Sequence, residues 1–244
     1  MDIKGKTALV TGAASGIGRA TALMLAERGA SKIVIADADE ARLPAVADAL
    51  QAAGATPIMK VADLCKVEAV TRLFEEADQE TGGLDIVFNN AGRITRGPDF
   101  PDCDLASMVA VIQLNLIAVM VGTYAAVQLM RRRGAPGVIV NTSSKAAFSD
   151  MPADPAYCAS KYGVLGLTRS CKPLHDAFNI RVMAICPGLT DTPLLPKDAG
   201  WLSPYLPSVI LFTPEDIARE VVRIVEDDTL AGEHVLLSER LVSA

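Results

Sequence analysis

The sequence predicts an α/β protein: a doubly wound parallel sheet of about seven strands, with helices on both faces, in one domain that spans residues 1–244. Short runs of β-branched residues alternate with longer helix-like segments along the whole chain, which is the order of a parallel sheet with crossover helices. The early runs are apolar at consecutive positions, a pattern typical of strands that are covered on both faces. No composition break, internal repeat or low-complexity linker divides the 244 residues.

The expected strands are short and the expected helices are long. We expect strands at Thr7–Val10, Ile33–Ile35, Pro57–Val61, Ile86–Phe88, Val138–Val140, Arg181–Ile185 and His234–Leu237. We expect helices from the first strand to Arg28, over Glu40–Ala53, Val67–Glu80 and Leu105–Arg132, from Ala156 onward, and over Ile217–Val225. Pro173 falls late in the helix that starts near Ala156, so this helix should kink or end early. Ligands of such sheets bind beyond the carboxyl ends of the strands, so the residues after each strand are the ones to examine for chemistry.

Composition and charge exclude several classes of protein. Half of the residues are apolar, which excludes an intrinsically disordered chain. The net charge of −6, without basic blocks, disfavours a nucleic-acid partner. Neither of the two histidines lies near a cysteine in a metal-ligand pattern, so we expect no metal. The odd number of cysteines, five, and an N-terminus without an export signal indicate reduced thiols in a cytoplasmic protein.

The apolar segment Val109–Val127 is as long as a membrane span, and three arginines at 131–133 follow it. Gln113 and Asn115 lie in its first half, where polar groups would be costly in hydrocarbon. The segment also lies between two expected strands, within the regular alternation. We therefore expect no membrane partner, but a helix that is covered by the sheet and by a second subunit. The arginines would then lie at its C-terminal end, where cations favour the helix dipole.

Three glycines, Gly12, Gly16 and Gly18, follow the first expected strand. They permit a tight turn, a close approach of the backbone to a pyrophosphate, and close packing of helix on strand. The helix that begins there offers free N–H groups and its dipole to phosphates, so Ser15 and Ile17 are also expected to contact a dinucleotide. A glycine cluster after a strand is by itself also compatible with a plain tight turn.

Asp37 directly follows the second expected strand. A carboxylate at that place accepts the ribose hydroxyls of NAD and repels the 2′-phosphate of NADP. No Lys or Arg stands at positions 13–15 or 38 to reverse that preference. The sequence thus predicts NAD as the cofactor, although Asp37 could alternatively be a solvated or helix-capping residue.

Polar residues follow the later strands in a fixed order: Asp63-Leu64, Asn89-Asn90-Ala91-Gly92, Asn115, Ser144, Tyr157, Lys161, and Pro187-Gly188 with Thr190 and Thr192. Over residues 5–193 the sequence resembles the short-chain dehydrogenase/reductase family, whose sheet is Rossmann-like. The resemblance implies that Asn115, Ser144, Tyr157 and Lys161 are catalytic. It implies cofactor contacts, in addition to those of Tyr157 and Lys161, at Asp63, Leu64, Asn89, Ala91, Gly92, Pro187, Gly188, Thr190 and Thr192. It also implies a homodimer or homotetramer.

The catalytic roles follow from ordinary acid–base chemistry. Tyr157 and Lys161 lie one helical turn apart on the same face. A nearby ammonium and a positive nicotinamide ring favour the phenolate, which moves the pKa of Tyr157 from about 10 towards neutrality and makes it a general base. Ser144 can hydrogen-bond to the substrate oxygen; Ser143 is the rival hydroxyl, and the spacing to Tyr157 favours Ser144. The resemblance implies that Asn115 holds a water that carries the proton towards solvent. Each of these side chains alone could instead be a packed or solvated structural residue.

The insert Leu194–Phe212 belongs to an expected substrate lid at residues 190–213 and carries only Lys197 and Asp198 as charges. It has leucine and aromatic side chains but no Arg for a phosphate or carboxylate. We therefore expect a hydrophobic secondary alcohol or its ketone, of a steroid-like, alicyclic or aryl-alkyl kind. The insert could instead only pack the lid or a subunit contact. The expected substrate residues are Ser144, Tyr157, Leu194, Trp201 and Tyr205.

Two other functions stay open. One is an NADPH-dependent ketoreductase of thioester-bound substrates, which Asp37 disfavours. The other is a catalytically silent nucleotide-sensing protein, which the complete set of Ser144, Tyr157 and Lys161 disfavours. The chain also departs from the family's usual pattern in three places. Lys145 adds a charge near the pocket rim, and Pro173 falls within the helix that starts near Ala156. Residues 239–244 lack the usual glycine-rich segment, which puts the oligomer geometry in doubt.

Overall fold

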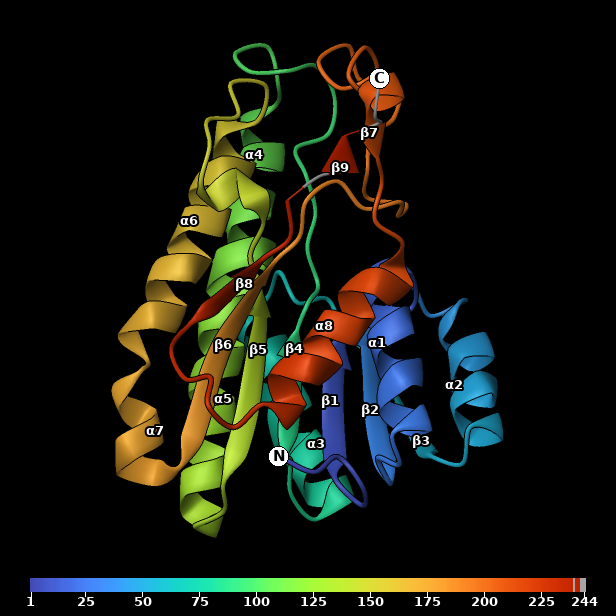
Figure 1. Ribbon diagram of the computed structural model, residues 1–244, viewed down its shortest axis with the longest axis vertical. Coiled ribbons are helices and arrows are strands. Elements are labelled where there is room, and N and C mark those ends of the chain that lie inside the picture. The colour runs from blue at the N-terminus through green and yellow to red at the C-terminus, as the bar shows by residue number, and fades with distance from the viewer. Residues whose placement is uncertain (239, 242–244) are drawn as a thin grey trace.

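Seven parallel strands form one twisted sheet at the centre of the protein (Figure 1). The computed structural model describes residues 1–238, 240 and 241. The strands of this sheet are β1 (Thr7–Thr11), β2 (Lys32–Asp37), β3 (Thr56–Val61), β4 (Ile86–Asn89), β5 (Gly137–Thr142), β6 (Ile180–Cys186) and β8 (His234–Leu236). Their order is β3-β2-β1-β4-β5-β6-β8, with parallel pairing throughout. The winding reverses between β1 and β4, which confirms the predicted doubly wound, Rossmann-like fold and locates its ligand-binding edge.

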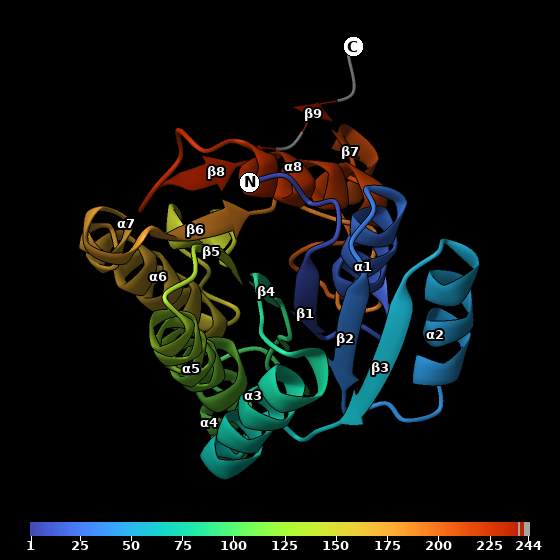
Figure 2. The same cartoon turned by 90° about the horizontal axis from the view of Figure 1, so that it is seen from below.

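Helices cover both faces of the sheet (Figure 2). One face carries α1 (Gly16–Glu27), α2 (Leu43–Ala52) and α8 (Pro214–Glu226), and the other carries α3 (Val67–Thr81), α5 (Ala118–Arg133) and α6 (Pro155–Ser170). Successive strand residues alternate between the two layers, because side chains leave a strand on opposite sides. Val10 packs with residues of α1 and α8, whereas Leu9 packs with residues of α3 and α5. The consecutive apolar residues of the central strands are therefore buried on two sides.

The predicted elements are present, with different ends. Most predicted strands are one or two residues too short at an end, because polar residues such as Asn89 and Thr142 continue them. α6 ends at Ser170, and Pro173 lies in the first turn of α7 (Pro173–Phe178). This confirms the interruption expected at that proline, which lacks the N–H that a helix interior needs.

The edge strand β3 contradicts the expectation that the early strands are covered on both faces. Ile58 packs on the α3 side of the sheet. Met59 and Val61 leave β3 on the opposite side and are 50% and 57% exposed. In the described part of the chain, β3 pairs with β2 alone. An apolar run therefore did not distinguish this edge strand from a central one.

The predicted helix Leu105–Arg132 consists of three segments. These are α4 (Leu105–Ile112), a π-helical turn (Gln113–Ile117) and α5. A π-helical turn interrupts the regular helical repeat and often occurs at functional sites. Asn115 lies in this turn and is fully buried. The apolar residues around it hide the irregularity from a reading of the periodicity.

The stretch Leu105–Arg133 is apolar and long enough to cross a membrane by length and composition alone. In the protein, α5 packs against α3 and the sheet, where Ala126 and Met130 are buried. Other apolar side chains of the stretch remain exposed. These are Leu105, Val109, Met120 and Tyr124. The stretch is thus a core element on one side and exposes apolar residues on the other.

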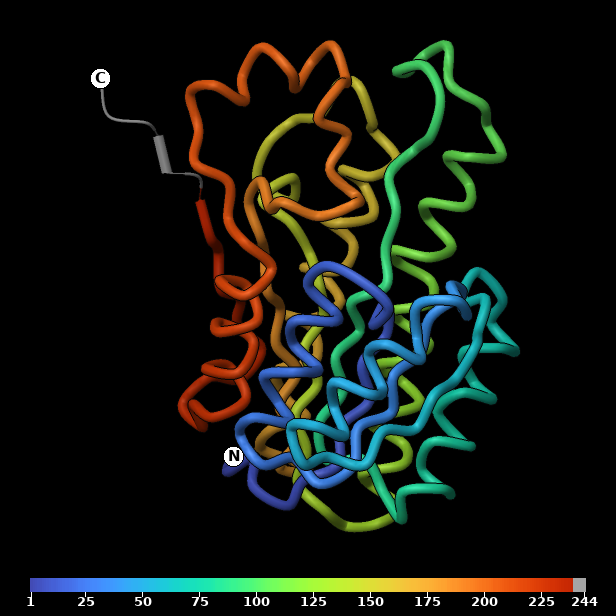
Figure 3. The backbone as a smooth tube through the Cα atoms, turned by 90° about the vertical axis from the view of Figure 1, so that its right-hand side faces the viewer, coloured from blue at the N-terminus to red at the C-terminus, as the bar shows by residue number. Residues whose placement is uncertain are grey.

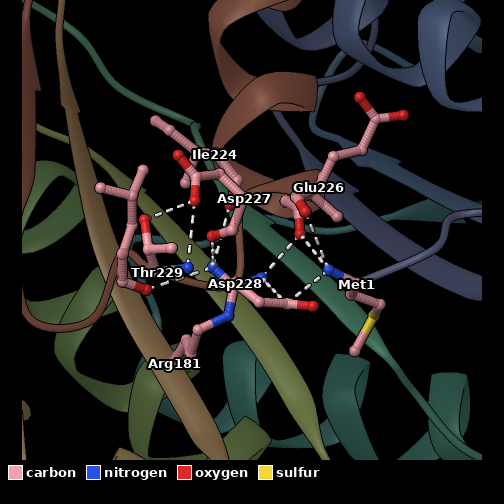
Figure 4. Close-up of polar contacts among 9 residues, drawn as sticks. Met1, Arg181, Ile224, Glu226, Asp227, Asp228 and Thr229 are labelled. Atoms are coloured by element: carbon pink, nitrogen blue, oxygen red, sulfur yellow. Dashed lines mark hydrogen bonds and ion pairs between the residues drawn. The ribbon is translucent and has the colours of Figure 1, made fainter.

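Two cations close the C-terminal end of α8 (Figure 4). Arg181 on β6 is buried, and its guanidinium donates to Oδ1 of Asp228 and to four carbonyl oxygens, those of residues 224, 225, 227 and 230. The Met1 ammonium donates to the carbonyl oxygens of Val225 and Glu226 and to Asp228. These donors satisfy carbonyls that a helix leaves free at its end and favour its dipole.

Connecting segments rise above the carboxyl edge of the sheet. Figure 3 shows the lid, residues 190–213 (orange), and the segment after β4 (green) at the same end of the molecule. The lid contains a 3₁₀ turn (Leu206–Ser208) and β7 (Val209–Ile210), which pairs antiparallel with β9 (Arg240–Leu241). A second 3₁₀ turn (Lys145–Ala147) follows β5. The expectation drawn from residues 239–244 lies outside the described residues, apart from the strand at 240 and 241.

Candidate active site

A cavity of about 990 Å³ opens at the carboxyl ends of the strands. Residues that follow β1, β2, β3, β4, β5 and β6 line it together with the lid. The predicted site residues line this cavity, with three exceptions: Gly18, Asn89 and Asn115. The fold therefore brings predicted site residues from most of the chain together at one cavity.

The glycine turn forms one end of the cavity. Gly12 and Gly16 adopt φ of +64° and +52°, and a Cβ on Gly12 would lie 2.9 Å from Cα of Ala91. A Cβ on Gly18 would lie 2.1 Å from the Gly12 carbonyl oxygen, so Gly18 packs α1 onto β1 and does not line the cavity. α1 begins at Gly16 and points its N-terminal end at the cavity, which suits a pyrophosphate.

Asp37 is held at the end of β2, beside the glycine turn. Its Oδ2 accepts from the Ala14 N–H at 2.9 Å, and its Oδ1 accepts from the Asp39 N–H at 3.0 Å. The partly buried carboxylate lines the cavity. It is therefore oriented by the backbone where the ribose of a dinucleotide would lie.

Asp63 and Leu64 line the cavity after β3 as predicted, and Asp63 Oδ1 accepts from the Cys65 N–H at 3.2 Å. After β4, the two asparagines have different places. Asn90 lines the cavity and donates from Nδ2 to the Thr11 carbonyl oxygen at 3.0 Å, which ties β4 to the glycine turn.

Asn89 was predicted to contact the cofactor, and the structure places it elsewhere. Its side chain is buried and donates from Nδ2 to Oδ1 of Asn141 on β5 at 2.9 Å. Asn141 in turn donates to Thr168 on α6 at 3.2 Å. Asn89 is the last residue of β4 and directs its amide into the interior, whereas Asn90 lies just past the strand end, where the cavity opens.

Asn115 acts through the backbone of the cavity wall. Its Oδ1 accepts from the Arg93 N–H at 2.8 Å, and its Nδ2 donates to the Arg93 carbonyl oxygen at 2.8 Å and to Ser160 Oγ at 3.2 Å. The side chain thus fixes the segment after β4 to the π-helical turn and to α6. The expectation that Asn115 holds a water stays a prediction.

Ser144, Tyr157 and Lys161 line the cavity together. Ser144 begins the turn after β5, where its Oγ accepts from the Ala146 N–H at 3.1 Å and hydrogen-bonds with the Tyr157 phenol. The rival Ser143 is 1% exposed, and its hydroxyl donates to the Lys161 carbonyl oxygen at 2.8 Å. The choice of Ser144 by spacing thus agrees with the geometry.

The electrostatics of the pair differ from the expectation. Burial raises the pKa of Tyr157, the charge of Asp154 adds to the rise, and the hydrogen bond with Ser144 opposes it. Burial lowers the pKa of Lys161 to about 8. Lys161 Nζ donates to the Thr142 carbonyl oxygen at 2.8 Å and lies 5.5 Å from the centroid of the Tyr157 ring. The ammonium is therefore directed at the backbone rather than at the phenol oxygen, and desolvation decides the direction of the Tyr157 shift.

Leu194, Trp201 and Tyr205, the lid residues predicted to contact the substrate, line the cavity together with charged residues. Lys145 also lines it, as expected for a charge near the pocket rim. Further lining residues were not predicted from the sequence: Arg93, Ile94 and Arg96 after β4, and Asp150 and Met151 after β5. Their positions beyond two strand ends were the signal in the sequence.

Arg93 lies near Cys65, the residue that follows Asp63 and Leu64. Its charge acts to lower the pKa of the Cys65 thiol, although burial raises that pKa overall. Its Nε is buried and has no hydrogen-bond partner among the described residues.

These observations fit a nicotinamide dinucleotide. A Cβ at Gly12 would press on Ala91 and one at Gly16 on Thr192, so only glycine keeps this turn tight beside the cavity. The N-terminal end of α1 faces the cavity, and Asp37 is oriented for ribose hydroxyls. Lys161 uses only one of its three donors within the described structure, on Thr142. Among the residues that the structure describes, no group of three His, Cys, Asp or Glu side chains is arranged to hold a metal.

Three of the curated proteins to which the chain is similar are named as dehydrogenases of hydroxy compounds. It is 37% identical over 226 residues to cis-4-hydroxycyclohexanecarboxylate dehydrogenase of Sinomonas cyclohexanicum, covering 91% of this chain and 90% of the relative. It is 33% identical to the NAD(+)-dependent 15-hydroxyprostaglandin dehydrogenase of Bos taurus, covering 95% and 90%. It is 37% identical to a 3β-hydroxysteroid dehydrogenase of Mediterraneibacter gnavus, covering 80% and 70%.

Solved structures show the same architecture. A short-chain dehydrogenase/reductase of Mycobacterium marinum superposes with a TM-score of 0.89 at 26% identity, covering 97% of this chain and 95% of the other. A short-chain dehydrogenase of Burkholderia cenocepacia, solved with NADP, superposes with a TM-score of 0.88 at 31% identity, covering 97% and 98%. The family model described as short chain dehydrogenase matches residues 6–202. The chain therefore belongs to the short-chain dehydrogenase/reductase family and is an oxidoreductase.

Proposed function

We propose that this protein is an NAD-dependent dehydrogenase that interconverts a hydrophobic secondary alcohol and its ketone, with Tyr157 as general acid and base. The observation that carries the proposal is that Ser144, Tyr157 and Lys161 line the same cavity as the glycine turn and Asp37. A nicotinamide supplies the hydride chemistry when it is bound. The residues of this chain supply orientation and proton transfer.

Each side chain of the site has a distinct task in this proposal. Ser144 holds the substrate oxygen, and the Tyr157 phenolate takes the hydroxyl proton in oxidation or returns it in reduction. Lys161 offers its remaining donors to the nicotinamide ribose, and its charge favours the phenolate. Asn115 keeps the wall at Arg93 in place. The lid excludes water from the reacting atoms.

The preference for NAD rests on Asp37. Its carboxylate is fixed beside the glycine turn, where it would accept ribose hydroxyls and repel a 2′-phosphate. The relative from Bos taurus is named as an NAD(+) enzyme, which supports NAD. The Burkholderia cenocepacia neighbour holds NADP, so cofactor choice varies within the family and needs a direct test.

An alicyclic secondary alcohol fits the substrate end best. The apolar lid residues favour a hydrocarbon frame, and two relatives are named for a hydroxycyclohexane and a hydroxysteroid substrate. Arg96 also lines the cavity, which favours a polar or anionic substituent on the substrate. This refines the sequence-based expectation of an entirely hydrophobic compound.

The test is NADH formation at alkaline pH from four alcohols. These are cyclohexanol, cis-4-hydroxycyclohexanecarboxylate, the methyl ester of that acid, and a 3β-hydroxysteroid, each assayed in parallel with NADP. We expect turnover with NAD for at least one alicyclic alcohol. Faster turnover with NADP would favour the ketoreductase alternative. Tight NADH binding without turnover of any alcohol or ketone would favour a nucleotide-sensing protein.

We also propose a cytoplasmic homo-oligomer, a homodimer or homotetramer, in which a second copy covers the exposed apolar residues of α4 and α5. Val109 and Tyr124 are 47% and 67% exposed, which is costly for apolar side chains in water. Light scattering on the purified protein measures the mass. A single-chain mass at micromolar concentration would contradict this proposal.

A further inference from the structure

Asp154 is a buried carboxylate to which the proposed mechanism gives no role. It precedes Tyr157 by one turn as the N-cap of α6, and it is 6% exposed. Its Oδ1 accepts from the Tyr157 N–H at 3.0 Å and from Thr95 Oγ1 at 2.7 Å, and its Oδ2 accepts from the Thr95 N–H at 2.8 Å. Within the described residues its donors are thus neutral groups of Thr95 and Tyr157.

Capping α6 does not require this charge. Ser, Thr and Asn cap helices about as well as Asp, because an uncharged oxygen accepts the same N–H bond. A buried carboxylate without a cation costs free energy, which hydrogen bonds and the positive end of the helix dipole offset only in part. The buried negative charge of Asp154, one helical turn before the proposed acid–base group Tyr157, therefore indicates a role in the reaction.

The three hydrogen bonds of Asp154 join two parts of the cavity. Thr95 belongs to the segment after β4, whose neighbours Ile94 and Arg96 line the substrate end. Asn115 fixes the same segment at Arg93. The cavity wall is therefore held at two points, and Asp154 connects it to the first turn of the helix that carries Tyr157 and Lys161.

We propose that Asp154 is a positioning residue of the proposed reaction: its carboxylate locks the cavity wall at Thr95 to the first turn of α6, and its negative charge favours the neutral phenol of Tyr157 over the phenolate. This rests on the assignment of Tyr157 as the acid–base group. Tyr157 then serves as the proton donor for ketone reduction over a wider pH range, and alcohol oxidation needs a more alkaline pH.

Other groups around Tyr157 are consistent with this role. The charge of Asp154 contributes to the raised pKa of Tyr157, after burial and against the Ser144 hydrogen bond. Lys161 has its own pKa lowered to about 8 by burial, and its Nζ is directed at the Thr142 carbonyl oxygen. The further charged side chains that line the cavity from the neighbouring segments are Arg93, Arg96, Lys145, Asp150 and Asp198. Among all these, Asp154 combines burial with a direct bond to the Tyr157 backbone.

The test removes the charge while keeping the cap. In Asp154→Asn and Asp154→Ser we expect the acid limb of kcat/KM for alcohol oxidation to move to lower pH by about one unit, because loss of a nearby anion stabilises the phenolate. Thr95→Val is the matched control, because it removes the Thr95 hydroxyl donor and keeps the charge of Asp154. In this variant KM should rise several-fold, while the acid limb of kcat/KM stays at its wild-type pH. Asp154→Glu should retain most of the wild-type pH profile.

A readout without turnover separates this proposal from the proposed function. The ultraviolet difference spectrum of tyrosine ionisation, with Tyr157→Phe as baseline, reports the phenol directly in the full chain. A downward shift of that titration in both neutral variants supports the role of Asp154 even if no alcohol is a substrate. An unchanged titration in correctly folded variants, with a loss of activity no different from that of Thr95→Val, would overturn the electrostatic role.

Discussion

Arg181 and Lys161 are both buried cations, and they differ in how their donors are used. Arg181 makes hydrogen bonds to four carbonyl oxygens and to Asp228 at the end of α8 (Figure 4). Lys161 makes a hydrogen bond to the Thr142 carbonyl oxygen and otherwise faces the cavity. Both pKa values are lowered by burial, but nearby Asp228 and Asp227 counteract the effect at Arg181, whereas the pKa of Lys161 falls to about 8.

The difference shows how to separate a structural charge from a functional one. A buried cation whose donors are all used by the protein stabilises the fold, and its removal leaves acceptors unsatisfied. A buried cation with donors to spare is unfavourable to the fold until a ligand supplies acceptors. Burial and charge alone do not distinguish a structural cation from a functional one. The number of its N–H donors that the protein itself satisfies does.

The largest expected effect is a loss of catalytic activity at the cavity, with no change in the free energy of unfolding. Tyr157→Phe should lower kcat by about 10²–10⁴-fold, because it removes the acid–base group. NADH binding should change little, since the phenol is not needed to hold the dinucleotide. Steady-state kinetics and NADH fluorescence titration measure the two quantities. Tyr162→Phe, an exposed tyrosine of the same helix, is the matched control. A kcat within tenfold of wild type for Tyr157→Phe would contradict the assignment.

The second prediction compares the two cations directly. Arg181→Met should lower the free energy of unfolding by about 3–5 kcal/mol, because it leaves a set of buried acceptors without donors. Lys161→Met should raise the free energy of unfolding at pH 7, while NADH binding weakens strongly. Urea unfolding and NADH titration of both variants give the result. Equal losses of stability in the two variants would show that the number of satisfied N–H donors does not separate their roles.

The third prediction uses the pH dependence of stability. The pKa of Lys161 is lowered in the folded protein to about 8 from 10.5, so the unfolded chain binds the proton more tightly between these values. Stability therefore rises with pH in this window. The Lys161→Met variant should exceed wild type in stability at pH 7, and this advantage should shrink by about 2–3 kcal/mol towards pH 10. A pH-independent difference between the two proteins would contradict the lowered pKa.

The sequence predicted the parts of the site that depend on local order. The glycine turn, Asp37, Ser144 and the Tyr157–Lys161 pair lie at strand ends or one helical turn apart, so strand order and helix period place them. The sequence did not predict features that depend on contacts between distant segments. Burial of Tyr157 and the direction of Lys161 Nζ decide the electrostatics, and neither follows from spacing.

The contacts that were not predicted have the same physical origin. Asn89 is the last residue of β4, and its amide contacts Thr123 and Asn141 in the interior, which a motif alone does not reveal. The contact of Asn115 with Arg93 was not predicted, because the π-helical turn does not show in the periodicity. Asp154 was not predicted, because Thr95, which it binds, is remote in sequence, and Arg96 belongs to none of the predicted motifs.

The smallest expected effect concerns the other end of the cavity, where recognition depends on one anion. Asp37→Ala should lower the ratio of kcat/KM with NAD to that with NADP by about ten- to a hundredfold, because a hydrogen bond to a charged group contributes roughly 1.5–3 kcal/mol. Asp39→Ala is the control: it removes the same charge two residues on, from a side chain that does not line the cavity. If both variants change the ratio equally, the general negative field selects the cofactor. If only Asp37→Ala changes it, the carboxylate that the Ala14 and Asp39 N–H groups orient is the selecting group, because only an oriented anion both accepts the ribose hydroxyls and excludes a phosphate at the same place.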